Sequence, residues 1–262
     1  MNPRNWFAAA YAFLSFLRRG PACCTPSWLD FSEEHASMIP RKFFTLLTLA
    51  AASALFALAS ARPQDAPPWR QLFNGKDLTG WKHVGPGGMT VEDGLIRTHG
   101  GMGLLYWTGE MFGECRIRVV YKMRDFNDNS GVFIRIPIEP REPWMPVHYG
   151  YEVQIDNHPE TSNEDEYHVT GTLYSLTKPL ALPGKPGPEW NTMFIKLDGP
   201  HTVVVLNDVT VTDYTEGQPV PERKFDFEPQ RGTRPNKGYI GLQNHSDNDI
   251  VFFKEVSLQS LP

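Results

Sequence analysis

The chain has 262 residues, of which 40% are hydrophobic and 21% charged, and these proportions exclude a disordered protein, a collagen-like repeat and a multi-span membrane protein. The formal net charge is -5 and there is no long run of Lys or Arg, so nucleic acid is not an expected partner. With 22 Gly and 23 Pro, turns are frequent and long helices are not expected. The composition therefore favours an all-β protein.

Residues 38–61 have the order of a secretory signal peptide. A short basic segment follows Met38, then an apolar run at 43–59, then the small residues Ala59-Ser60-Ala61. The apolar run would span about 25 Å as a helix, less than the roughly 30 Å of a bilayer core. We therefore expect cleavage after Ala61 and export to the periplasm or the extracellular space, with no stable membrane anchor afterwards.

The 37 residues before Met38 are unusual, because a signal peptide normally begins at the initiator methionine. We interpret residues 1–37 as an over-extended reading frame; the alternative is a genuine N-terminal extension. Residues 62–68 are a Pro-rich linker, and 69–262 are expected to form one domain. From residue 62 onward there are 20 basic and 27 acidic side chains, a net charge of -7, and Cys115 is the only cysteine, so no disulfide within that segment is expected.

The domain shows short stretches of strand-like alternation and no clean helical periodicity. Three two-residue turn signals, Asp93-Gly94, Asp198-Gly199 and Asn207-Asp208, predict hairpins. The predicted strands are 103–107, 114–124, 131–137, 149–156, 191–197, 201–206, 209–213, 238–244 and 249–259. Nine strands are too many for one flat sheet, so we expect a jelly-roll β-sandwich. The long stretches 138–150, 157–170 and 176–189 are expected to be loops that carry a site.

Polar residues alternate with apolar ones along three of these strands. Glu152, Gln154 and Asp156 share one face of the fourth strand. In the third strand we expect Val132, Ile134 and Ile136 to face the core, and Gly131, Phe133 and Arg135 to face away. In the strand 238–244 and just after it, Gln243 and His245 point outward. If the three strands are neighbours, they form a polar surface with one aromatic ring, which suits a sugar; the alternative is an ordinary solvated face on each strand.

Seven segments in order along the chain resemble the 3-keto-disaccharide hydrolase family, long known as a domain of unknown function. The resemblance extends from about Trp69 to Leu261. The segments are 72–81 (LFNGKDLTGW), 91–96 (VEDGLI), 129–135 (NSGVFIR), 151–156 (YEVQID), 170–174 (TGTLY), 189–191 (EWN) and 241–245 (GLQNH). The resemblance implies a concanavalin-like jelly roll, and members of the family are commonly exported by bacteria.

The activity that the resemblance implies is cleavage of glycosides already oxidised to a ketone at C3. The ketone acidifies the C2 proton, so that a base can remove it, and the glycosidic oxygen then leaves C1 by β-elimination. Addition of water completes a net hydrolysis. This chemistry needs a base, a group that stabilises the enolate and a proton donor for the leaving oxygen.

The resemblance and the residue types together give a candidate site. We expect Glu152 or His245 to be the base and Arg135 to neutralise the enolate, unless a divalent cation held by Glu152, Asp156 and His245 does so. Asn129, Gln154 and Gln243 are expected to bind hydroxyls, with Phe133 and Asp156 also contacting a glycoside substrate. Three loop histidines could supply a further acid or ligand, or could simply be surface residues: His148, His158 and His168.

Two other functions remain open from the sequence. A conventional glycoside hydrolase would use the carboxylates of Glu152 and Asp156, but four residues along a strand separate them by about 13 Å, more than a retaining or inverting pair allows. A non-catalytic carbohydrate-binding module is the other alternative, because jelly rolls host both functions.

Overall fold

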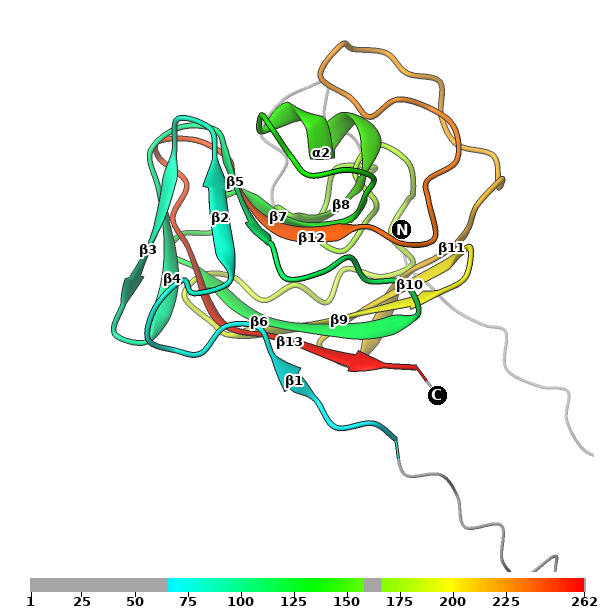
Figure 1. Cartoon of the computed structure of the whole chain (residues 1–262). Coiled ribbons are helices and arrows are strands. Elements are labelled where there is room, and N and C mark those ends of the chain that lie inside the picture. The colour runs from blue at the N-terminus through cyan, green and yellow to red at the C-terminus, as the bar shows by residue number, and fades with distance from the viewer. Residues whose placement is uncertain (1–65, 158–165, 262) are drawn as a thin grey trace, which may run out of the picture. The chain divides into compact units, whose positions relative to one another are not determined.

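A computed structural model of the chain describes residues 66–157 and 166–261, and these form thirteen β-strands and one short helix (Figure 1). The elements are β1 (Arg70–Gln71), β2 (Trp81–Val84), β3 (Gly88–Glu92), β4 (Leu95–His99), β5 (Gly103–Trp107), β6 (Cys115–Met123), β7 (Ser130–Ile136), α2 (Trp144–Tyr149), β8 (Tyr151–Ile155), β9 (Asn191–Asp198), β10 (His201–Leu206), β11 (Val209–Thr215), β12 (Tyr239–Asn244) and β13 (Val251–Ser260).

The strands form two antiparallel sheets. The larger sheet has the order β11-β10-β9-β6-β13-β4-β3, with β1 also paired to β13, and the smaller has the order β2-β5-β12-β7-β8. The main hydrophobic core lies between the sheets and includes Ile117, Ile195, Val132 and Val153, all at most 1% exposed. The expected two-sheet all-β sandwich is therefore confirmed.

Two of the predicted turns have the backbone that a tight hairpin needs. Asp93 and Gly94 both have positive φ, at 51° and 77°, as do Asn207 and Asp208, at 48° and 67°. Positive φ at both central residues is the requirement of the type I′ turn. The first turn joins β3 to β4 and the second joins β10 to β11. The third signal, at Asp198-Gly199, lies between β9 and β10.

All nine predicted strands are present, within two residues at each end, but the prediction missed β1 to β4. These strands are only two to five residues long and contain several polar residues. So short a stretch does not show the alternation of apolar and polar side chains by which a strand is predicted. The loop predicted at 138–150 contains the helix α2. Its prolines, Pro143 and Pro146, lie at the N-cap and in the first turn, where a missing N–H costs no hydrogen bond.

The alternation predicted for β7 is wrong at its end. Phe133 and Ile136 pack in the same small cluster on the outer face of the smaller sheet, under α2. Arg135 has φ 53°, and the β7–β12 register shifts between Tyr239 and Gly241. This irregularity reverses which face the last residues of the strand present, so Ile136 faces outward and Arg135 turns toward the larger sheet.

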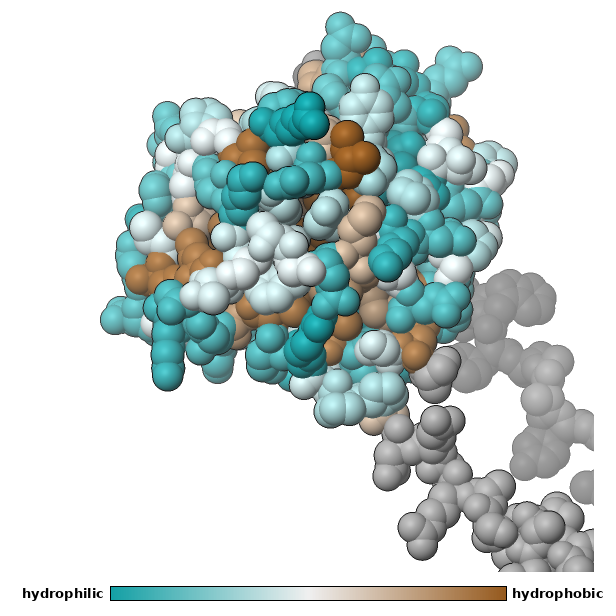
Figure 2. Space-filling model, in the orientation of Figure 1, coloured by the Kyte–Doolittle hydropathy of each residue, from teal (hydrophilic) through white to brown (hydrophobic). Residues whose placement is uncertain are grey.

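Hydrophobic residues on the face shown in Figure 2 form small groups among hydrophilic ones. In the described ranges, no helix is long and apolar enough to cross a bilayer. Cys115 is free and buried. The predicted signal peptide, its cleavage site and residues 1–37 lie outside the described residues.

Candidate active site

The site lies on the outer face of the smaller sheet, where β12, β7 and β8 run side by side. In the pairing register, Phe133 lies opposite both Gly241 and Glu152, and Gly131 lies opposite Gln154. Continuing the register by two residues places Gln243 on the other side of Gly131. Because side chains two apart share a face, Glu152, Gln154 and Gln243 project from the same side of the sheet.

Gly131 forms the floor between these side chains. A Cβ at this position would lie 2.5 Å from Oε1 of Glu152 and 2.7 Å from its Cγ. The absence of a side chain on the central strand therefore leaves the space in which the carboxylate of Glu152 lies. Glu152 is 5% exposed.

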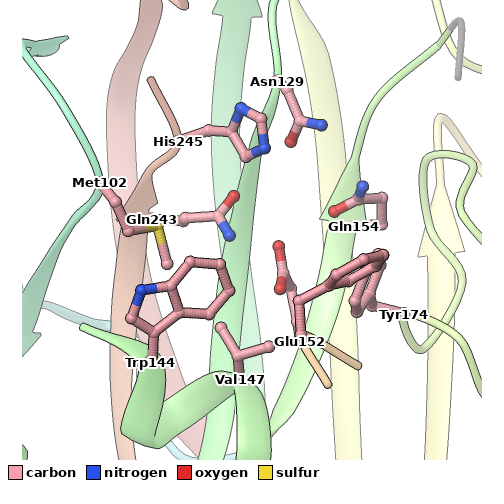
Figure 3. Close-up of a pocket in the computed structure, with 10 residues that line it drawn as sticks. Met102, Asn129, Trp144, Val147, Glu152, Gln154, Tyr174, Gln243 and His245 are labelled. Carbon is pink, nitrogen blue, oxygen red and sulfur yellow. The ribbon is translucent and has the colours of Figure 1, made fainter. Parts of the chain in front are cut away.

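A cavity of about 360 Å³ opens above this floor (Figure 3). In Figure 3 the carboxylate of Glu152 points to the middle of the cavity between Gln243 and Gln154, and His245 and Asn129 face each other at one end. Its lining residues are Met102, Asn129, Trp144, Val147, Glu152, Gln154, Tyr174, Phe227, Gln243 and His245. The volume is within the range of small-ligand sites.

The environment of Glu152 favours its protonated form. Burial raises the pKa of Glu152 to about 8, and the negative charge of Asp156 adds to this; the nearby His245 and a hydrogen bond from Gln243 oppose it. A carboxyl group with a pKa near ambient pH is suited to proton transfer, and such shifts are common in active sites.

Three amide oxygens around the cavity are buried and have no hydrogen-bond partner: Oδ1 of Asn129, Oε1 of Gln154 and Oε1 of Gln243. Gln154 and Gln243 are only 3% and 4% exposed. A buried acceptor without a donor costs free energy. A ligand with several hydroxyl groups would satisfy all three oxygens, so the polar end of the cavity fits a polyol.

His245 is oriented by Asp249. Its Nδ1 lies 2.7 Å from Oδ2 of Asp249, which also accepts a hydrogen bond from Oγ of Ser246 at 2.5 Å. Partial burial lowers the pKa of His245, but this hydrogen bond and the charges of Asp249, Glu152 and Asp156 outweigh it and raise the pKa above its ordinary value. Nε2 of His245 is left for a ligand, and the raised pKa favours the protonated imidazole.

A reciprocal pair of hydrogen bonds fixes the loops that carry Asn129 and His245. Oδ1 of Asp249 accepts the backbone N–H of Asn129 at 2.9 Å, and Oδ1 of Asp128 accepts the backbone N–H of Ile250 at 3.0 Å. We call this arrangement the carboxylate clasp. It ties the β6–β7 loop to the β12–β13 loop and sets the distance across one end of the cavity.

The other end of the cavity is apolar. Trp144 of α2 and Phe227 of the 216–238 loop line it and are 43% and 46% exposed. Figure 1 shows α2 and this loop on the same side of the smaller sheet. Arg234 joins them by donating to the backbone oxygens of His148 and Gly150, at 3.2 and 2.9 Å. Exposed rings at such a mouth can pack against the apolar face of a sugar.

The structure brings five of the predicted residues into this cavity: Asn129, Glu152, Gln154, Gln243 and His245. Asp156 lines an adjoining cavity instead and accepts a hydrogen bond from Nδ2 of Asn129 at 3.2 Å. Phe133 is fully buried under α2, so it is not an exposed platform for a sugar ring.

The role predicted for Arg135 is not supported by its position. Its guanidinium lies between the sheets and donates to the backbone oxygen of Gly199 at 2.7 Å and to Oδ1 of Asn236 at 3.2 Å. Arg135 therefore joins β7 to the β9–β10 turn and does not line the cavity. The reversal at the end of β7 explains the error.

The loop histidines are not in the cavity lining either. Nε2 of His148 lies 3.2 Å from the backbone oxygen of Asp226, and the ring stacks on Trp144. His168 is buried, with its ring centroid 4.8 Å from that of Tyr174. His158 lies outside the described residues.

No group of three or more His, Cys, Asp or Glu side chains able to hold a metal is present in residues 66–157 and 166–261. The predicted set of Glu152, Asp156 and His245 is thus not assembled as a metal site in the described residues. Sequence analysis also missed Asp249, Trp144 and Phe227. The spacing from His245 to Asp249 was visible, but nothing in the sequence showed that the two side chains meet.

A family match and a curated relative point to the same group of proteins. Residues 68–259 match the family described as a 3-keto-alpha-glucoside-1,2-lyase-like domain. A 3-keto-disaccharide hydrolase of Bacteroides thetaiotaomicron is 25% identical over 236 residues, covering 76% of this chain and 80% of that protein.

Two solved structures are similar in fold. A protein of Parabacteroides distasonis assigned as a glycosyl hydrolase has a TM-score of 0.62 and 23% identity, covering 74% of this chain and 94% of its own. A Bacillus subtilis protein with a galectin-like fold has a TM-score of 0.53 and 11% identity, covering 76% and 97%. These confirm the jelly-roll expectation, and the match over 68–259 shows that the chain belongs to the 3-keto-alpha-glucoside-1,2-lyase-like domain family.

Proposed function

We propose that this protein cleaves the glycosidic bond of 3-keto-glycosides by β-elimination followed by hydration. The observation that carries the proposal is the buried carboxylate of Glu152, the one carboxylate among the described residues that line the cavity. It is surrounded by three unpartnered amide oxygens and lies near an imidazole oriented by Asp249. Family membership and the 3-keto-disaccharide hydrolase relative support the choice of substrate.

In the proposed elimination, the carboxylate of Glu152 removes the C2 proton, and the electron pair forms an enolate with the C3 oxygen. The enolate then collapses: the C3 carbonyl re-forms, a C1–C2 double bond forms and the bond from C1 to the glycosidic oxygen breaks. Nε2 of the protonated His245 gives its proton to the leaving oxygen. The products are a 3-keto sugar unsaturated at C1–C2 and a free alcohol.

Hydration reverses the proton transfers. Neutral His245 takes a proton from water as the oxygen bonds to C1, and Glu152 returns its proton to C2. Both side chains regain their starting states, and the sum is hydrolysis. The enolate oxygen would be held by neutral amide N–H donors; Gln154 is the candidate, since Gln243 donates to Glu152. Donors fixed in a buried site stabilise developing charge effectively.

A conventional glycosidase mechanism receives less support. It needs two carboxyl groups on either side of the scissile bond, but Glu152 is the only carboxylate among the described residues that line this cavity. A binding module would not need a carboxyl group whose pKa burial raises to about 8.

The decisive assay compares methyl 3-keto-α-glucoside with unoxidised methyl α-glucoside, using wild type and Glu152→Gln. We expect turnover of the keto sugar alone, with a loss of at least about 100-fold in Glu152→Gln. Cleavage of the unoxidised glycoside would favour the conventional glycosidase, and binding without turnover would favour the module.

We also propose that the chain is exported with cleavage after Ala61. The order of basic, apolar and small residues at 38–61 supports this. N-terminal sequencing of the protein secreted or exported by its host should give Arg62 as the first residue; a mature N-terminus far from Arg62 would contradict the proposal.

A further inference from the structure

A second cavity adjoins the first and shares two of its walls. Its volume is about 510 Å³, and both cavities are lined by Asn129 and His245. In Figure 3 these two residues lie at the end of the first cavity that is opposite Trp144 and Val147. The carboxylate clasp holds the loops on which both residues lie. A ligand that fills the first cavity and extends beyond it at this end passes His245.

The proposed chemistry requires an extension in this direction. The C2 proton must reach Glu152 in the first cavity, while the glycosidic oxygen on the neighbouring C1 must reach His245. The group attached to that oxygen therefore lies beyond His245. The unpartnered oxygens of Gln154 and Gln243, both on buried side chains, face the first cavity. Because sugar hydroxyls would satisfy these oxygens, the keto sugar belongs in the first cavity.

The lining of the second cavity is polar, and most of its charged side chains are acidic. It contains the carboxylates of Asp125, Asp128, Asp156 and Asp249. The cations of its lining are Arg124, which binds Oδ1 of Asp128 at 2.9 Å, and His245, which binds Asp249. Four negative charges thus face one guanidinium and one imidazole. Amide and hydroxyl groups of the lining can exchange hydrogen bonds with sugar hydroxyls: Asn127, Ser246 and Asn248.

We propose that the second cavity binds the leaving group of the substrate, and that its excess of carboxylates selects an uncharged sugar and rejects an anionic one. The inference rests on the proposed function. An anionic leaving group would face four carboxylates and only two cations, Arg124 and His245, each of which is already paired with one of those carboxylates. Such repulsion discriminates effectively between otherwise similar ligands.

Three substrates test this inference: methyl 3-keto-α-glucoside, a 3-keto-disaccharide with glucose as the leaving sugar, and the same disaccharide with glucuronate in that place. At low salt we expect kcat/KM for the glucose compound to exceed that for glucuronate by at least about tenfold. The gap should narrow at about 0.5 M NaCl, because salt screens exposed charges. Equal kcat/KM values for the two disaccharides would overturn the inference.

Variants assign the effect to the second cavity. Asn127→Ala and Asn248→Ala should lower kcat/KM for the glucose disaccharide at least threefold more than for the methyl glycoside. Asp125→Asn should lower, several-fold, the ratio of kcat/KM for the glucose disaccharide to kcat/KM for the glucuronate disaccharide. Asp247→Asn is the matched control, since Asp247 is on the same loop as Asn248 but outside the lining. It should change neither the kcat/KM ratio of glucose disaccharide to methyl glycoside nor that of glucose to glucuronate disaccharide.

The outcomes separate the two proposals. Turnover of the methyl glycoside with no discrimination between the disaccharides, or with equal losses on every substrate in the Asn variants, overturns the leaving-group site alone. No turnover of any keto-glycoside overturns the proposed function itself.

Discussion

The carboxylate of Glu152 lies directly over Gly131 of the neighbouring strand, and a Cβ on that glycine would come within 2.5 Å of Oε1. The close approach is set by the β7–β8 register, which places Gly131 opposite Gln154 and next to Glu152. A glycine is required here by space, not by backbone conformation, because Gly131 does not have positive φ.

Gly131→Ala should therefore fold and lose activity. The new methyl group would lie 2.5 Å from Oε1 and 2.7 Å from Cγ of Glu152, so the whole side chain must turn away. A displacement of about 1 Å at a catalytic group can cost about 100-fold in rate. Circular dichroism should show native structure while kcat/KM for the keto-glycoside falls. Gly113→Ala is the control, because its Cβ would meet nothing closer than 3.5 Å. Wild-type activity in Gly131→Ala would contradict the placement of Glu152.

Glu152→Gln should become more stable than wild type as pH rises. Burial raises the pKa of Glu152 to about 8, so between the ordinary pKa near 4.5 and pH 8 the folded state binds more protons than the unfolded state. In the wild type, the contribution of Glu152 to the free energy of unfolding is fully present below pH 4.5. It falls as the pH rises and is lost above about pH 8. Glutamine does not titrate.

Thermal unfolding at pH 6 and pH 9 measures the effect. The Tm of Glu152→Gln relative to wild type should rise by at least a few degrees between these pH values. A Tm difference that is independent of pH would show that Glu152 is not held in its protonated form by the fold.

The activity should depend on pH with two limbs, and Asp249→Asn should move only one of them. On the acid side, kcat/KM should fall about tenfold per pH unit below about 8 as Glu152 is protonated. On the alkaline side it falls as His245 loses its proton. Because the charge and hydrogen bond of Asp249 raise the pKa of His245, Asp249→Asn should move the alkaline limb to lower pH.

Asp128→Asn is the comparison for that variant. It weakens the other half of the carboxylate clasp without touching His245, so it should lower Tm but leave the alkaline limb in place. An identical shift in both variants would mean that Asp249 acts only through loop structure.

Trp144→Ala should weaken substrate binding with little change in kcat. Trp144 lines the apolar end of the cavity and is 43% exposed, and a ring of this kind contributes about 0.5–1.5 kcal/mol, so KM should rise about 2- to 12-fold. Tyr149→Ala is the control on the same helix, since Tyr149 is 50% exposed and outside the lining. Equal KM values for Trp144→Ala and wild type would place the sugar elsewhere.

Arg135→Met should destabilise the fold and spare the chemistry. The buried guanidinium donates to Gly199, Asn236 and Thr202, and removing it leaves their oxygens without a donor. A loss of about 3–5 kcal/mol would lower Tm by about 10 °C. Arg97→Met, at a partly exposed ion pair with Glu92, should cost at most about 1 kcal/mol.

The activity of Arg135→Met, measured well below its Tm, distinguishes its two possible roles. We expect kcat within about threefold of wild type. A loss of 100-fold in a folded protein would restore Arg135 as the group that stabilises the enolate.

Strand alternation and turn chemistry are local properties, and the sequence alone determined them correctly in most places. The period of two placed Glu152, Gln154 and Asp156 on one face, and positive-φ residues such as Asn207 and Asp208 marked a hairpin. The failure at Arg135 is also local in origin: one residue with positive φ reverses the faces of a strand, and arginine gives no sign of it.

What the tertiary structure decided is which distant side chains meet. Pairing of β12, β7 and β8 brings Gln243 and His245 beside Glu152, and the clasp joins Asp128 and Asn129 to Asp249 and Ile250 across about 120 residues of chain. Trp144 and Phe227 come from segments far apart in the chain, and Arg234 helps to hold those segments together. Alternation fixes the direction of a side chain but not its neighbours, since strand order and register depend on the packing of the whole sandwich.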